Sequence, residues 1–212
     1  MRTVIFGGGE IKDYGRVREY IQDGGYIICA DGGYDHALAM GIKPDLLIGD
    51  FDSISAVPDD IKTVRYPVKK DMTDSEIALE TAIKTANTES ANAAAAKTEI
   101  LLFGFTGDRA DHTLANMLLL LKYKNAVIID DNNEIRPLCG TLEINGRVGQ
   151  TVSIIPVNGD LRGVVTEGLE YPLNGETLRI GESRGVSNVM TGDTASISCK
   201  EGQGLVIKVE KV

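Results

Sequence analysis

The chain has 212 residues, 42% of them hydrophobic, 25% charged and 5% aromatic, with no Trp and a formal charge of −9. This length predicts one or two domains, each able to bury a core without disulfides. The negative charge argues against nucleic acid or an anionic membrane as a partner, because either would repel it. No apolar run is long enough for a membrane helix, and neither a signal peptide nor a paired Cys motif is recognisable. We therefore expect a cytoplasmic protein.

Residues 1–136 alternate short apolar runs with helical patterns. The runs are bounded by Gly, Asp or Pro, as buried parallel strands usually are. The predicted strands are Thr3–Phe6, Tyr26–Ala30, Leu46–Ile48, Thr63–Tyr66, Ile100–Phe103 and Ala126–Ile129. Alternation of this kind predicts a parallel sheet with helices on its faces.

Two helices are predicted between these strands. The segment Thr73-Asp74-Ser75-Glu76 is a capping box that opens the first helix. Asp111 is expected to cap the second, over Thr113–Lys122, with an apolar face formed by Leu114, Met117, Leu118 and Leu121.

Residues 137–212 have a different composition and no helical period. They hold two of the 17 Asp but half of the 24 Gly. Short β-branched runs recur about every ten residues, separated by glycine-containing turns, which is typical of a small antiparallel sandwich. The predicted runs are Thr141–Ile144, Thr151–Val157, Gly163–Thr166, Thr177–Ile180, Ala195–Cys199 and Leu205–Val209.

The predicted architecture therefore has two domains. An α/β N-terminal domain with a mostly parallel sheet covers residues 1–136. A small all-β antiparallel sandwich domain covers residues 137–212.

The third predicted strand runs into Gly49-Asp50-Phe51-Asp52-Ser53. In extended backbone, carboxylates at i and i+2 point to the same side, here at the carboxyl end of a strand, where open α/β sheets bind ligands. Mg²⁺ prefers such oxygen ligands, with substrate phosphates completing its coordination. Asp50 and Asp52 are therefore candidate metal ligands, although an isolated Asp-x-Asp is also common in solvated turns.

Two further loops have the same character. Asp31-Gly32-Gly33 follows the second strand, and its glycines allow the backbone to approach a ligand closely. Lys70-Asp71-Met72-Thr73-Asp74 lies where a helix begins. That end of a helix favours anions, whereas Asp74 could instead serve a metal.

The fourth loop, Gly107-Asp108-Arg109-Ala110-Asp111-His112, lies between a strand and a helix. Its Arg, its glycine and the backbone N–H groups of the helix start suit phosphate oxygens. His112 and Asn116 are spaced i, i+4 and are expected to face the same way.

Several common motifs are absent. Gly7-Gly8-Gly9 is followed by Lys12 where a dinucleotide fingerprint has its third glycine. No Walker loop and no Gly-x-Ser-x-Gly elbow occurs. The four Asp- and Gly-rich loops together indicate Mg²⁺-dependent phosphoryl or pyrophosphoryl chemistry on a nucleotide.

The order and spacing of these motifs, with a late Gly185-Val186-Ser187-Asn188, resemble the thiamine pyrophosphokinase family from about residue 5 to residue 190. The resemblance implies transfer of the pyrophosphoryl group of ATP to the thiamine hydroxyl, giving thiamine diphosphate and AMP. It also implies a homodimer in which thiamine lies between the α/β domain of one subunit and the sandwich of the other.

The resemblance also implies roles for individual residues. Asp50, Asp52 and Asp74 would hold Mg²⁺ against the triphosphate, and Lys70 and Arg109 would neutralise phosphate charge. Asp71 is our choice of general base, with Asp74 and Lys70 also assigned to catalysis. The other implied ATP and thiamine contacts are Asp31, Gly32, Gly33, Asp111, His112, Asn116, Ser187 and Asn188.

The chain departs from the family in one respect. Some members stack a Trp on thiamine, whereas any stacking here must come from one of seven Tyr or four Phe. Met190 is a softer alternative wall.

Two other interpretations are open. Asp50-x-Asp52, with Asp130-Asp131 later, resembles the haloacid-dehalogenase-type phosphatases, in which Asp50 would be phosphorylated. A thiamine- or nucleotide-binding module without catalysis is the second alternative.

Overall fold

The computed structural model describes residues 2–21, 24–51, 59–67, 71–89 and 98–210. The chain forms two compact units. Unit 1 comprises Met1–Leu119 and Asn125–Asp131, and unit 2 comprises Leu120–Lys124 and Asn132–Val212.

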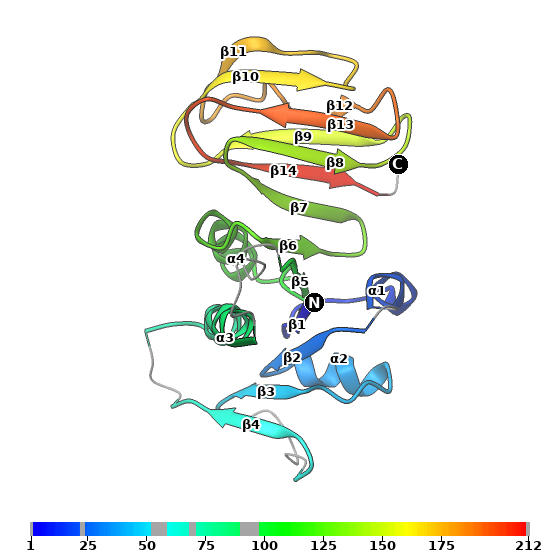
Figure 1. Cartoon of the computed structure of the whole chain (residues 1–212), viewed down its shortest axis with the longest axis vertical. Coiled ribbons are helices and arrows are strands. Elements are labelled where there is room, and N and C mark those ends of the chain that lie inside the picture. Colours follow the sequence, from blue (N-terminus) through cyan, green and yellow to red (C-terminus); the bar gives the residue numbers. More distant parts are fainter. Residues whose placement is uncertain (1, 22–23, 52–58, 68–70, 90–97, 211–212) are drawn as a thin grey trace. The chain divides into compact units, whose positions relative to one another are not determined.

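Unit 1 contains a parallel sheet in the order β6-β5-β1-β2-β3-β4 (Figure 1). Every pairing in it is parallel. Its strands are β1 (Thr3–Phe6), β2 (Tyr26–Ala30), β3 (Leu46–Gly49), β4 (Lys62–Arg65), β5 (Ile100–Phe103) and β6 (Ala126–Ile129). All six predicted strands are confirmed to within one residue at each end. Five are apolar runs that are largely buried, as in a sheet covered on both faces, whereas β4 is largely exposed.

Four helices cover this sheet: α1 (Tyr14–Ile21), α2 (Gly33–Ala39), α3 (Asp74–Glu89) and α4 (Ala110–Lys122). Figure 1 shows α1 and α2 on one side of the strands and α3 and α4 on the other. On the α1 and α2 side, Val17 and Ala37 share a buried cluster with Val4 and Phe6 of β1. The alternate side chain Ile5 is equally buried, as expected for a strand with helices on both faces.

The Thr73 half of the predicted capping box is confirmed. The backbone N–H of Glu76 donates to Thr73 Oγ1 at 3.2 Å, which satisfies one of the free donors at the start of α3. This bond fixes the direction in which α3 leaves its loop.

The prediction for α4 was wrong in two respects. The helix begins at Ala110, so Asp111 lies in its first turn and does not cap it. Leu114 and Leu118 are exposed, whereas Asn116 and Leu120 are buried. The apolar residues do recur at helical spacing, but a neighbouring stripe of the helix faces the protein. In that stripe the Asn116 amide has a backbone partner.

The strands of unit 2 pair antiparallel in two groups, confirming the predicted sandwich class. Their strand orders are β12-β9-β14-β7 and β11-β10-β13-β8. The strands are β7 (Asn133–Leu138), β8 (Thr141–Asn145), β9 (Thr151–Pro156), β10 (Leu161–Glu167), β11 (Asn174–Leu178), β12 (Asn188–Val189), β13 (Thr194–Ser198) and β14 (Gly204–Val209). The sequence did not predict β7, which contains Pro137, and the expected boundary after Arg136 falls within this strand.

The inner faces of the two sheets enclose an apolar core that includes Ile154, Leu178, Ile197 and Val206. The alternating burial of β9 and β10 follows the two-residue period of a strand with one covered face. Among the described residues, no helix has the length and apolar character needed to cross a membrane.

Candidate functional site

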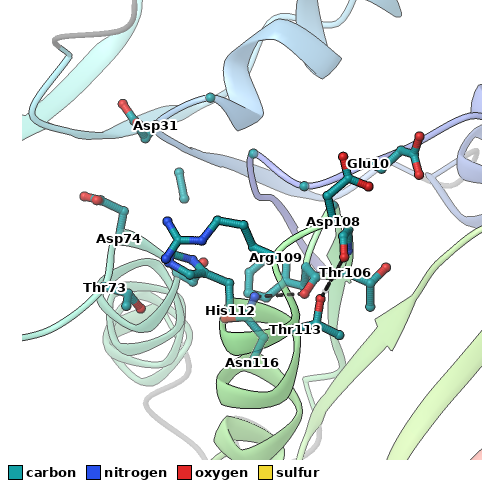
Figure 2. A pocket seen from close by; sticks show the side chains of 18 of the residues that line it. Glu10, Asp31, Thr73, Asp74, Thr106, Asp108, Arg109, His112, Thr113 and Asn116 are labelled. Atoms are coloured by element: carbon teal, nitrogen blue, oxygen red, sulfur yellow. Dashed lines mark hydrogen bonds between the residues drawn. The ribbon is translucent and has the colours of Figure 1, made fainter.

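A cavity of about 690 Å³ lies in unit 1 at the carboxyl ends of β1, β2 and β5 (Figure 2). This is the edge at which open α/β sheets bind ligands. Its lining residues are Gly8, Gly9, Glu10, Ala30, Asp31, Gly32, Met72, Thr73, Asp74, Ser75, Gly104, Phe105, Thr106, Gly107, Asp108, Arg109, His112, Thr113 and Asn116.

Two glycine-rich loops form one wall of this cavity. The N–H of Gly9 donates to Gly104 O at 2.8 Å, and the N–H of Glu10 donates to Thr106 O at 2.9 Å. A Cβ on Gly9 would lie 2.2 Å from Thr106 O, so only glycine allows this approach.

The sequence analysis missed the loop after β1 as part of the site. Its glycines do not match the dinucleotide-binding pattern, so they were not predicted to belong to the site. The loop could have been predicted from the same feature as Asp31 and Gly32, namely glycines that directly follow a buried strand.

Two of the predicted carboxylates line the cavity together. Asp31 follows β2 with a positive φ of 45°, and its N–H donates to Ile48 O at 2.7 Å. Asp74 is the first residue of α3. Figure 2 shows both side chains on the same side of the cavity, across from Glu10 and Asp108.

The remaining predicted metal ligands have different positions. Asp50 follows β3 and is absent from the cavity lining, while its carbonyl accepts a bond of 3.1 Å from Arg65 Nε. Asp52 and Lys70 lie outside the described residues. Within the described part of the chain, no group of three His, Cys, Asp or Glu side chains is placed to hold a metal ion.

The predicted glycines divide between two roles. Gly32 lines the cavity, but Gly33 is buried beneath it. A Cβ on Gly33 would lie 2.0 Å from Phe6 O, so this glycine allows α2 to start directly against β1.

Among the described residues that line the cavity, Arg109 is the one Arg or Lys. Its Nη2 lies 2.6 Å from Asp111 Oδ2, and its Nε lies 3.2 Å from Oδ1. The hydrogen bond from Arg109 lowers the pKa of the exposed Asp111 carboxyl to about 2. Asp111 is not part of the cavity lining, so it contacts the site through Arg109.

His112 and Asn116 both line the cavity, confirming that they share one side of α4. Asn116 is buried, and its Nδ2 donates to Phe105 O at 2.8 Å. The amide therefore anchors the loop after β5. His112 is exposed at the start of α4, where it is free to meet a ligand.

The helix starts give the cavity its electrostatic character. α3 and α4 both begin at residues beside the cavity lining, and helix N-termini attract anions through their free N–H groups and dipole. Asp71 is exposed and lies outside the lining. The geometry thus combines anion-binding groups with the carboxylates Asp31 and Asp74.

Ser187 and Asn188 belong to unit 2. Asn188 is buried, its Oδ1 accepting the N–H of Tyr171 at 3.0 Å and its Nδ2 donating to Tyr171 O at 2.8 Å. The Tyr171 side chain is 63% exposed. Met190 is a core residue only 1% exposed, so the idea that it forms a ligand wall was wrong.

A doubly covered parallel sheet with glycine loops and two helix starts around one cavity is typical of α/β proteins that bind phosphate groups, and here it is joined to a β-sandwich. Residues 17–129 match the family "Thiamin pyrophosphokinase, catalytic domain", and residues 140–203 match "Thiamin pyrophosphokinase, vitamin B1 binding domain". The chain belongs to the thiamin pyrophosphokinase family and is an enzyme.

Relatives of known structure have the same architecture. The chain is 29% identical to the thiamine pyrophosphokinase of Bacillus subtilis (strain 168), covering 98% of this chain and 99% of the relative. The crystal structure of the Bacillus subtilis thiamine pyrophosphokinase covers 100% of both chains with a TM-score of 0.84 and 26% identity. That of the Geobacillus thermodenitrificans thiamin pyrophosphokinase gives 0.82 and 30%, covering 100% of this chain and 98% of the other.

Family membership overturns the phosphatase alternative. The late acidic pair that contributed to it, Asp130-Asp131, has hydrogen-bond partners within unit 1. Asp131 accepts the N–H of Asp13 at 2.8 Å, and Asp130 accepts the Thr106 hydroxyl at 3.4 Å.

Proposed function

We propose that the chain transfers the pyrophosphoryl group of ATP to the hydroxyl of thiamine, with Mg²⁺ as cofactor, giving thiamine diphosphate and AMP. The observation that supports this most strongly is the make-up of the unit 1 cavity. Two helix starts, two glycine loops and Arg109 surround a space that also contains Asp31 and Asp74. A polyphosphate with a divalent cation satisfies both kinds of group at once.

The donor set fits Mg²⁺. Asp31 and Asp74 provide carboxylate oxygens in one cavity, and Mg²⁺ is usually bound through one or two carboxylates together with substrate phosphates. Asp50 and Asp52 stay predicted ligands. Bound there, the cation would neutralise charge on the triphosphate during transfer.

The triphosphate would be held by the anion-binding elements. Arg109 can donate two parallel hydrogen bonds to phosphate oxygens, and Asp111 keeps its guanidinium near the cavity through their ion pair. Lys70 is a predicted second cation. Gly32, Gly33, His112 and Asn116 contribute by shaping the loops or by contacting the nucleotide.

The reaction needs positioning more than covalent assistance. The thiamine hydroxyl oxygen forms a bond to the β-phosphorus of ATP, and the bond from that phosphorus to the α,β-bridging oxygen breaks. AMP leaves with that oxygen, and a carboxylate accepts the hydroxyl proton. Asp71 stays the predicted base, although it lies outside the cavity lining and Asp74 belongs to it.

Thiamine is proposed to bind at the Ser187–Asn188 edge of the sandwich, in a homodimer whose second subunit completes each site. Asn188 fixes the backbone of Tyr171 and leaves its ring exposed. Thiamine contains a cationic thiazolium ring, and aromatic faces attract cations. Tyr171 is therefore our candidate for the aromatic partner in a chain without Trp.

Replacing Tyr171 tests this assignment. Tyr171→Ala is expected to raise KM for thiamine about tenfold, because a cation–π contact is worth roughly 1–2 kcal/mol. KM for ATP should stay within about twofold. Tyr171→Phe keeps the ring and should behave like the wild type. Equal effects of Ala and Phe, or no effect of Ala, would rule out a stacking role.

The proposed activity is tested by product analysis. Incubation with thiamine, ATP and Mg²⁺ should yield AMP and thiamine diphosphate in equal amounts. Release of inorganic phosphate alone would indicate a phosphatase. Thermal stabilisation by thiamine without any product would indicate the binding module that the sequence analysis left open.

A further inference from the structure

The histidine of α2 contacts the glycine loop of the cavity without being part of the lining. His36 Nε2 lies 2.7 Å from Gly9 O, and its Nδ1 lies 2.9 Å from the Tyr14 hydroxyl. The two rings are tilted, with centroids 5.9 Å apart. The sequence analysis gave these two side chains no function, and the proposed reaction does not use them.

The partners fix the proton positions. A carbonyl oxygen can only accept, so Nε2 must carry the hydrogen that is donated to Gly9. In the neutral ring Nδ1 is then the acceptor, and the Tyr14 hydroxyl donates to it. The Gly9 carbonyl thus sets the tautomer of His36, and the Tyr14 hydroxyl supports it by donating to Nδ1.

The bond acts on a single peptide group. The carbonyl of Gly9 and the N–H of Glu10 belong to the same planar unit. The carbonyl is held by His36 on α2, and the N–H is held by Thr106 O at 2.9 Å in the loop after β5. This plane is therefore fixed from both sides, at the point where Gly8, Gly9 and Glu10 form the cavity wall.

Glycine makes this external support necessary. Gly9 has no Cβ to restrict its backbone, and a side chain could not be added, because its Cβ would clash with Thr106 O at 2.2 Å. Glycine loses more backbone freedom on ordering than any other residue. A wall of consecutive glycines therefore binds a ligand tightly only if other groups fix it beforehand.

We propose that Tyr14 and His36 are positioning residues that preorganise the Gly7–Glu10 loop for the triphosphate of the nucleotide. The inference rests on the proposed function, since it assigns the ligand of this wall. Neither side chain lines the cavity, so neither contacts the reacting atoms. The bond to Gly9 is expected to affect nucleotide binding and not thiamine binding.

Two substitutions of His36 separate positioning from packing. In His36→Gln the amide nitrogen reaches the place of Nε2 and can still donate to Gly9. In His36→Asn the shorter side chain reaches only the place of Nδ1, so the bond to Gly9 is lost. Tyr14→Phe removes the hydroxyl that donates to Nδ1 and holds the ring in place, and it should have an intermediate effect.

The first measurement is calorimetric binding of Mg-ATP, together with KM for both substrates. His36→Asn should weaken Mg-ATP binding about fivefold to tenfold, as expected for one lost hydrogen bond, and should leave KM for thiamine within about twofold. His36→Gln should restore binding to within about twofold of the wild type. If the His36→Asn and His36→Gln variants behave alike, or if KM for ATP and KM for thiamine rise together, the positioning role is wrong.

The second measurement is amide hydrogen exchange of residues 7–12 without ligand. Exchange should quicken in His36→Asn and Tyr14→Phe but not in His36→Gln, while β6 keeps its protection. Unchanged exchange in His36→Asn would overturn the inference. Failure of the proposed function has a separate signature, because wild-type protein would then form no AMP whatever the exchange data show.

Discussion

Asp74→Asn is expected to lower kcat by about a thousandfold. The substitution keeps the shape of the side chain but removes a charged oxygen donor from the cavity that also contains Asp31 and Arg109. Groups that stabilise charge during transfer typically contribute a hundredfold to a thousandfold each. Steady-state AMP formation at saturating ATP and thiamine measures the effect, and added Mn²⁺ should recover part of it if metal binding is what was lost.

Asp35→Asn is the matched control. Asp35 lies in the first turn of α2 as Asp74 lies in that of α3, so both substitutions remove a carboxylate from a helix start. Asp35 is exposed and outside the cavity lining, and its replacement should leave kcat unchanged. A comparable loss in both variants would mean that helix stability, and not the site, explains the result.

Asp71→Asn decides between the two candidates for the base. If Asp71 accepts the hydroxyl proton, its replacement should cost about a hundredfold or more in kcat. Full turnover in this variant would eliminate it and leave the cavity carboxylates as the acceptors.

Lys208→Met is expected to destabilise the protein by about 3 kcal/mol, the low end of the usual cost of breaking a buried ion pair, because Arg136 still pairs with Glu134. Lys208 Nζ lies 2.9 Å from Glu134 Oε2 and 3.2 Å from Glu210 Oε1, and it donates to Asn145 O at 2.8 Å. Glu134 is only 7% exposed. The melting temperature should fall by about 10 °C, as measured by calorimetry.

The double variant Glu134→Gln/Lys208→Met provides the counterpart. It also removes the charge of the buried carboxylate that has lost Lys208, so it should recover part of the lost stability. Lys200→Met, at an exposed position, should change the melting temperature by no more than about 2 °C. A single Lys208→Met variant as stable as the wild type would contradict the importance of the pair.

The same pair predicts how stability depends on pH. Burial opposes the charged form of Glu134, but the charges of Arg136 and Lys208 outweigh it and lower the pKa of Glu134. Its contribution is present above the unfolded value of about 4.3 and is lost as the pH falls through the lowered folded value. Burial likewise opposes charge on Lys208, but Glu134 and Glu210 raise its pKa.

On the alkaline side the sign reverses. The contribution of Lys208 is complete below the unfolded pKa of about 10.4 and is lost as the pH rises through the raised folded pKa. Stability should therefore be greatest between these limits. Lys208→Met should flatten the alkaline limb, which denaturant titrations across the pH range would show.

The elements that the sequence predicted best are those fixed by local chemistry. Apart from β4, the strands of unit 1 are short apolar runs that end at Gly or Asp. The capping bond from Glu76 to Thr73 involves residues three apart. Asp31, Asp74 and Arg109 were found because each follows or begins such an element. Their neighbours in the cavity come from the same edge of the sheet.

What the sequence could not predict depends on contacts between distant residues. The buried stripe of α4 includes Asn116 because its amide meets the carbonyl of Phe105, and no helical period contains that information. Asn188 was predicted as a ligand contact, yet its amide holds the backbone of Tyr171, 17 residues earlier. The role of Gly9 emerges only when the loops after β1 and β5 lie side by side.

The central claim, one-step transfer of a pyrophosphoryl group, is tested most directly with ATP labelled at the β-phosphorus. In a single turnover with thiamine and Mg²⁺, all of the label should appear in thiamine diphosphate, and AMP should form at the same rate without label. Labelled ADP together with thiamine monophosphate would show stepwise phosphoryl transfer and would contradict the proposed attack on the β-phosphorus.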